Sequence, residues 1–105
     1  MPLKNKNYRN PKITRFAKLK MCTLLIPGIC NGDPTTSVWA HSNLGRHGKG
    51  KGIKAHDFFG AIACSDCHDA VDGRRNDLTQ EDRVIYLNQG ISRTLPMLFD
   101  AGVIA

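Results

Sequence analysis

The four cysteines of this 105-residue chain restrict its fold more than any other feature. Cys64 and Cys67 form a C-x2-C pair, and Cys22 and Cys30 form a wider pair around a Pro-Gly turn. Four thiolates make a closed tetrahedral site for zinc. Aromatic residues make up only 7% of the chain, so such a cross-link would supply much of its stability. We therefore expect one structural Zn²⁺ bound by all four cysteines; the alternative for Cys22 or Cys30 is packing as a small buried hydrophobe.

The cellular compartment bears on how these cysteines are used. The chain has no apolar run long enough to cross a bilayer, and Pro27 and Gly28 interrupt the short apolar stretch that follows its basic start. We therefore expect a cytoplasmic protein without a membrane partner. Thiols stay reduced in that compartment, which favours metal binding over disulfides.

Positive charge is concentrated in two segments of a chain whose net charge is +6. Residues 1–20 hold seven Lys or Arg and no acid, and residues 44–56 hold four more, again without an acid. This pattern indicates a polyanionic partner, most commonly nucleic acid, although a solvated tail and loop would have the same composition. We expect residues 1–11 to be a basic flexible arm and residues 12–105 to be a single domain.

The order of elements predicts an α+β fold. Apolar spacing indicates a short basic helix over residues 12–20, followed by a β-rich segment over 21–26. Strands are expected over residues 35–41 and 58–64. The second strand leads into the C-x2-C pair and a helix capped by Ser65. The chain thus predicts a small zinc-stapled ββα core.

A C-terminal helix is expected after this core. Thr79 is a good N-cap, and apolar residues recur after it with helical spacing. Gly90 and Pro96 predict a kink or a break. Met97 and Phe99, near the end, could form a homodimer face or belong to the core.

Histidines and acids surround the C-x2-C pair. His41 ends the first expected strand, and a neutral imidazole suits a general base near pH 7. His68 and Asp72 are four residues apart on the expected helix and share a face, where they could hold Mg²⁺ or Mn²⁺. His68 could instead replace a cysteine at the zinc. Asp57 is a candidate either for ligating the divalent ion or for orienting His41.

Several basic residues are candidates for binding phosphate. Two of them follow the expected helix, and the others lie in the glycine-rich loop before the second strand. The full set is Arg46, His47, Lys49, Lys51, Lys54, Arg74 and Arg75.

These residues resemble those of HNH (His-Me finger) endonucleases. The resemblance rests on the Cys-Ser-Asp-Cys-His-Asp block at residues 64–69, after an apolar strand and with a His-ended strand upstream. More narrowly, residues 26–32, 36–41, 63–69 and 72–74, together with Lys54 and Asp57, resemble the YbcO-like nucleases of lambdoid prophages. The resemblance spans residue 18 to the C-terminus.

The resemblance implies a ββα-metal core and a phage or prophage protein acting in a bacterial host cell. His41 matches the family's strand histidine, the expected general base, and His68 matches the last histidine of the HNH pattern, an expected metal ligand. Two positions depart from that pattern. Ala40 stands where many HNH enzymes have an aspartate ligand, and Phe59 stands where they have the middle asparagine.

Two main hypotheses follow. The first is a divalent-metal-dependent endonuclease that hydrolyses phosphodiester bonds in DNA, gripping phosphates without reading sequence. The alternative is a non-catalytic four-cysteine zinc module that binds nucleic acid or a phage recombination partner, which the alanine before His41 favours. A third hypothesis is a zinc-stabilised protein-interaction module with incidental basic segments.

Overall fold

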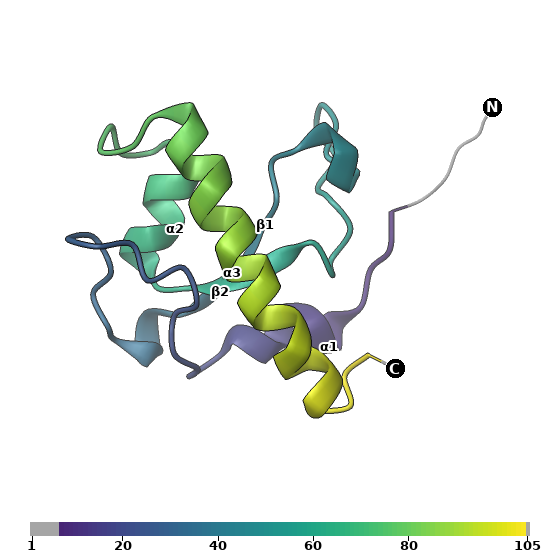
Figure 1. Ribbon diagram of the computed structural model, residues 1–105. Coiled ribbons are helices and arrows are strands. Elements are labelled where there is room, and N and C mark those ends of the chain that lie inside the picture. The colour runs from purple at the N-terminus through teal and green to yellow at the C-terminus, as the bar shows by residue number, and fades with distance from the viewer. Residues whose placement is uncertain (1–6, 105) are drawn as a thin grey trace.

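Two short antiparallel strands form the centre of the fold in the computed structural model, which describes residues 7–104 (Figure 1). Strand β1 (Val38–His41) pairs with β2 (Gly60–Ala63) so that His41 lies opposite Gly60. Both strands are shorter than the sequence pattern predicts. The first starts late because Pro34–Thr36 forms a 3-10 turn, η2, which is capped by the side chain of Asp33.

Helix α2 (Ser65–Val71) follows β2 directly. Its N-cap is Cys64, one residue before the expected Ser65, and the Cys64 sulfur accepts a hydrogen bond from the Cys67 backbone N–H. The helix ends before Gly73, whose positive φ of 80° suits glycine. The predicted α+β class is confirmed, with the element order strand, strand, helix at its centre.

Helix α3 (Gln80–Asp100) crosses the two strands and packs mainly against β2 (Figure 1). Thr79 caps it as expected, its hydroxyl accepting from the Asp82 N–H. Of the kink or break expected at Gly90 and Pro96, the break does not occur, because α3 is continuous through both residues. Pro96 lies on the exposed side of the helix, where water can satisfy the carbonyl left without a donor. Gly90 is buried where the helix approaches Ala61 closely.

The basic helix is shorter than predicted. It consists of α1 (Pro11–Thr14) and one 3-10 turn, η1 (Arg15–Ala17), and it ends before residue 20. Ile13 and Ala17 are buried, as their spacing predicts. Leu19 then takes a positive φ of 61°, which turns the chain away from the helix axis.

The β-rich segment over residues 21–26 forms no strand. Thr23 donates its backbone N–H to the Ile62 carbonyl at 2.8 Å, but Leu25 takes a φ of 49°, which interrupts an extended strand. Cys22, Leu24 and Ile26 are buried, and each is at most 5% exposed. The positive φ of Leu25 therefore ends the extended backbone that the composition of this segment predicts.

Small residues dominate the core on the cysteine side of the sheet. Ala40, Ala61 and Ala63 are fully buried there, which allows helix α3 to lie close to the strands. A second cluster on the other side contains Trp39 and Ile62 and is closed by α1, η1 and the end of α3.

The end of the C-terminal helix belongs to the core in part, and its role as a homodimer face stays a prediction. Leu98 is fully buried, whereas Phe99 is about half exposed. None of the helices within residues 7–104 has the length and apolar character needed to span a membrane. The expected basic arm begins with residues 1–6, which lie outside the described residues, while Asn7 to Asn10 make hydrogen bonds to the loop before β2.

Candidate active site and metal centre

The sulfurs of the four cysteines converge on one point. All four lie within 4.8 Å of one another, and the Cys30 and Cys64 sulfurs are 3.9 Å apart. A tetrahedral site with Zn–S bonds of about 2.3 Å separates its sulfurs by about 3.8 Å. No disulfide joins the four. The cysteine cluster therefore fits a tetrahedral metal ion such as zinc.

Local structure explains how distant cysteines meet. The backbone N–H of Cys30 donates to the Ile26 carbonyl at 2.9 Å, closing a turn in which Gly28 has a φ of 75°. On the other side, Cys64 and Cys67 occupy the N-cap and first turn of α2. The cysteine cluster thus joins the turn that leads toward β1 to the start of α2.

The buried thiols perturb one another. A hydrogen bond from Cys67 lowers the pKa of Cys22 to about 4, and the same hydrogen bond raises the pKa of Cys67. A readily formed thiolate is the species that binds zinc. Four sulfur donors at this spacing are the ligand set of a structural zinc site.

His41 ends β1 and is partly exposed. Its Nε2 lies 2.8 Å from Oδ1 of Asp57. The Asp57 residue is 3% exposed, and its backbone carbonyl accepts the indole N–H of Trp39 at 2.8 Å. Burial by itself would raise the pKa of Asp57, but hydrogen bonds from His41 and the Asn10 N–H lower it below its usual value. These contacts favour the orienting role for Asp57 over the ligand role.

His68 and Asp72 meet on one face of α2, as their spacing predicts. Nε2 of His68 lies 3.0 Å from Oδ2 of Asp72. Asn43 donates to Oδ1 of Asp72 at 3.2 Å, and Arg74 lies 3.4 Å from Oδ2. Burial would raise the pKa of Asp72, but His68, with help from Asn43 and Arg74, lowers it. The Asp72 carboxylate is thus held in its charged form.

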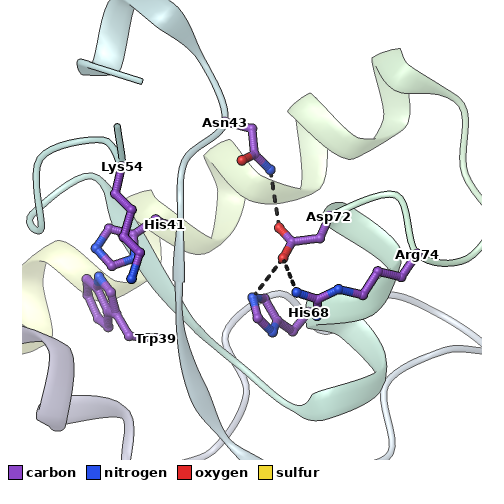
Figure 2. A pocket seen from close by; sticks show the side chains of 7 residues that line it. All are labelled: Trp39, His41, Asn43, Lys54, His68, Asp72 and Arg74. Atoms are coloured by element: carbon purple, nitrogen blue, oxygen red, sulfur yellow. Dashed lines mark hydrogen bonds and ion pairs between the residues drawn. The ribbon is translucent and has the colours of Figure 1, made fainter. Parts of the chain in front are cut away.

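One cavity of about 280 Å³ brings these two groups together (Figure 2). His41 lines it together with His68, Asp72 and other polar residues. Figure 2 shows Trp39, His41 and Lys54 in one group, and Asn43, His68, Asp72 and Arg74 in the other. The dashed lines in the figure all end on Asp72, which links the second group. Asp57 does not line the cavity.

The cavity wall offers few protein ligands for a second metal ion. Within residues 7–104, the four cysteines are the one cluster of three or more His, Cys or acidic side chains spaced for a metal. A divalent ion at His68 and Asp72 would therefore take its other ligands from water or from a phosphate. His68 does not belong to the cysteine cluster, so it does not replace a cysteine there.

The phosphate-binding candidates fall into different surroundings. Lys54 and Arg74 line the cavity, and Arg46 and Lys51 are exposed. Arg74 also pairs with Asp69 and Asp72, and the remaining three candidates have partners within the chain as well. Arg75 pairs with Asp77 and Asp66, His47 bonds to Ser42 and stacks on Phe59, and Lys49 donates to the Gly50 carbonyl.

Sequence reasoning missed four residues of this site. Trp39 and Asn43 line the cavity, while Arg9 and Asn10 contact Asp57. The period-2 pattern of β1 carried a signal for Trp39, because it lies two residues before His41 and shares its face of the strand. The contacts of Arg9 and Asn10 span more than 45 positions of the sequence, and local patterns carry no signal for them.

Known proteins resemble this chain over most of its length. Residues 11–103 match the family model described as "Putative nuclease YbcO". Relatives carrying this description, from Escherichia coli (strain K12) and Enterobacteria phage 82, are each 37% identical over 92 residues, covering 88% of this chain and 95% of their own. A solved structure of a putative bacteriophage protein from Escherichia coli K-12 has a TM-score of 0.69 and 34% identity, covering 86% of this chain and 99% of its own.

Proposed function

This chain belongs to the YbcO family, whose members are described as putative nucleases, and from that premise we propose that it is a divalent-metal-dependent DNA endonuclease of the HNH type. The observation that carries the proposal is the shared cavity, which holds a strand histidine beside a helical His-Asp pair. Phosphodiester hydrolysis needs a base for water and positive charge for the phosphate. The two sides of the cavity offer these two functions.

His41 acts as the general base in this proposal. Its imidazole takes the proton of a water molecule as that water attacks the phosphorus, and the bond to the leaving oxygen of the DNA backbone breaks. Asp57 holds the ring in place through the 2.8 Å contact to Nε2. A neutral imidazole can perform this step near pH 7.

His68 and Asp72 would hold the divalent ion, Mg²⁺ or Mn²⁺, with water or phosphate oxygens completing its ligands. Such an ion supplies Lewis-acid stabilisation of charge on the phosphate and on the leaving oxygen. Lys54 and Arg74 line the same cavity and would bind phosphate oxygens. None of these groups reads bases, so we infer binding without sequence specificity.

The four-cysteine centre would hold Zn²⁺ in a structural role. It anchors the start of α2, which carries His68 and Asp72, and the turn that leads toward β1, which carries His41. The zinc would thereby fix the separation between base and metal ligands.

Cleavage of supercoiled plasmid by zinc-loaded protein tests the proposal. We expect nicking that depends on Mg²⁺ or Mn²⁺ and stops when EDTA is added. His41→Ala, purified in parallel and verified by zinc content and circular dichroism, should lose at least about 100-fold in rate, as expected for a general base. Equal rates for His41→Ala and wild type would show that His41 is not the base.

A non-catalytic zinc module that binds nucleic acid is the second candidate. It is favoured by the small number of protein ligands at His68 and Asp72, by Ala40, and by Phe59, which packs against His47. This candidate predicts one zinc per chain and salt-sensitive DNA retention. It also predicts no nicking with either metal.

A further inference from the structure

The carboxylate of Asp57 has a different partner on each oxygen. Oδ1 lies 2.8 Å from Nε2 of His41, and Oδ2 accepts the backbone N–H of Asn10 at 2.6 Å. Arg9 lies 3.4 Å from Oδ1. The side chain of Asp57 is 5% exposed, so these protein groups, rather than bulk water, decide its orientation. A backbone N–H can only donate, which fixes Oδ2 as an acceptor.

We propose that Asp57, clamped by the N-terminal segment, fixes the tautomer of His41 and makes Nδ1 the atom that removes the proton from water. The inference rests on the proposed role of His41 as the base. An ionised carboxylate only accepts hydrogen bonds, so Nε2 of His41 carries its proton and Nδ1 keeps its lone pair. The lowered pKa of Asp57 is consistent with this assignment. Asp57 is therefore a positioning residue, because it acts through His41.

The N-terminal segment, residues 7–10, is hydrogen-bonded to Asp57 and to the loop residues that precede it. The Tyr8 carbonyl accepts the Asp57 backbone N–H at 3.0 Å, and the Tyr8 N–H donates to Nδ1 of His56 at 2.9 Å. Arg9 donates to the Ala55 carbonyl at 2.6 Å. These contacts hold the Asn10 N–H in place under Oδ2. Residues 8–10 thus belong to the site around His41 and Asp57, whether or not they also bind DNA.

The substitution Asp57→Asn gives the inference a directional test. The Asn10 N–H still needs an acceptor, so the new amide should place its oxygen there and turn its NH₂ group toward His41. Nε2 of His41 must then accept, and the ring must carry its proton on Nδ1. The variant should therefore hold His41 in the opposite tautomer rather than in a mixture of the two. Nδ1 would then carry a proton and could not accept one from water.

Long-range ¹H–¹⁵N correlation spectra of the full-length, zinc-loaded protein report the tautomer directly, at a pH where the imidazole is neutral. Besides Asp57, and Arg9 behind it, the charged or titratable groups around the cavity are Lys54, His68, Asp72 and Arg74, all unchanged in the variant. We expect the Nε2–H form in wild type and the Nδ1–H form in Asp57→Asn. Asp100→Asn, an exposed change of the same charge at the end of α3, should keep the wild-type tautomer and wild-type cleavage.

Cleavage kinetics give a second readout. Asp57→Asn should lower kcat by at least about 100-fold while KM changes by less than about threefold, because substrate binding does not use Asp57. An Nδ1–H tautomer in wild type, or an unchanged tautomer in Asp57→Asn, overturns the inference. The spectra do not depend on turnover. Absence of cleavage in every protein would therefore count against the proposed function, while the tautomers still decide the positioning role.

Discussion

Replacing Gly90 with alanine should destabilise the protein, although the same change stabilises most helices. Gly90 lies in the interior of α3, where alanine is favoured over glycine by about 1 kcal/mol. Here, however, an added methyl group would overlap the side chain of Leu24 and lie 3.0 Å from Cβ of Ala61. Ordinary contacts between carbons are about 3.5–4.0 Å. The methyl must therefore push α3 away from β2.

The net change in the free energy of unfolding is the overpacking cost minus the helix-propensity gain. Overpacking of a dense core costs about 1–3 kcal/mol, and the upper part of this range applies because Leu24 and Ala61 are at most 1% exposed. Subtracting the helix-propensity gain leaves a loss of about 1–2 kcal/mol. In a domain of this size each kcal/mol lowers Tm by about 4–8 °C. We therefore expect Tm to fall by roughly 5–15 °C for Gly90→Ala.

Thermal unfolding followed by circular dichroism, at one fixed zinc concentration, measures this shift, because bound metal raises apparent stability. Gly45→Ala is the matched control. A methyl group there meets nothing within 4 Å, and Gly45 does not have a positive φ. Its Tm should stay close to that of wild type. A Tm for Gly90→Ala equal to or above wild type would refute the close packing of α3 on β2.

Three further predictions concern the metal, the phosphate contacts and pH. Cys67→Ser should lose zinc, cooperative unfolding and DNA cleavage together, because Cys67 is a fully buried member of the cysteine cluster; cleavage that survives zinc loss would contradict the link. Lys54→Gln should reduce the slope of log K against log salt for DNA binding by about 0.9, the value for one phosphate contact, and an unchanged slope would remove Lys54 from the interface. The pKa of Asp57 is lowered in the fold, so Asp57 stabilises wild type above its unfolded value of about 3.9, and this stability is lost as the pH falls through the folded pKa. The stability difference between wild type and Asp57→Asn in urea denaturation should therefore shrink on acidification below about pH 4, and a constant difference would contradict the shift.

The sequence predicted those parts of the fold that depend on neighbouring residues or on metal-ligand spacing. The cap at Thr79 and the i, i+4 pair of His68 and Asp72 need only a helix of known geometry, and both occur as expected. The cysteine spacing likewise predicted the cluster, because four thiols in two pairs are typical of a tetrahedral zinc site. The cap and the helical pair depend only on residues within a few positions of each other, whereas the cluster follows from the ligands that zinc prefers.

Features that depend on distant contacts could not be predicted in this way. The segment over residues 21–26 has the composition of a strand, but the positive φ of Leu25 interrupts it, and its local pattern does not indicate that turn. Pro96 is tolerated because its side of the helix faces water. The position of Asp57 beside His41 depends on residues 8–10, whose contacts with the loop only the folded chain reveals.

Trp39 gives the cavity a built-in fluorophore. It is the one tryptophan of the chain, it is 8% exposed, and its indole N–H donates to the carbonyl of Asp57 while the side chain lines the cavity. Its emission therefore originates next to His41, without interference from any other indole. A nucleotide or metal ion that enters the cavity should change the wavelength or intensity of that emission. Titrations can thus follow occupancy of the site in variants that do not turn over, with no label attached to either partner.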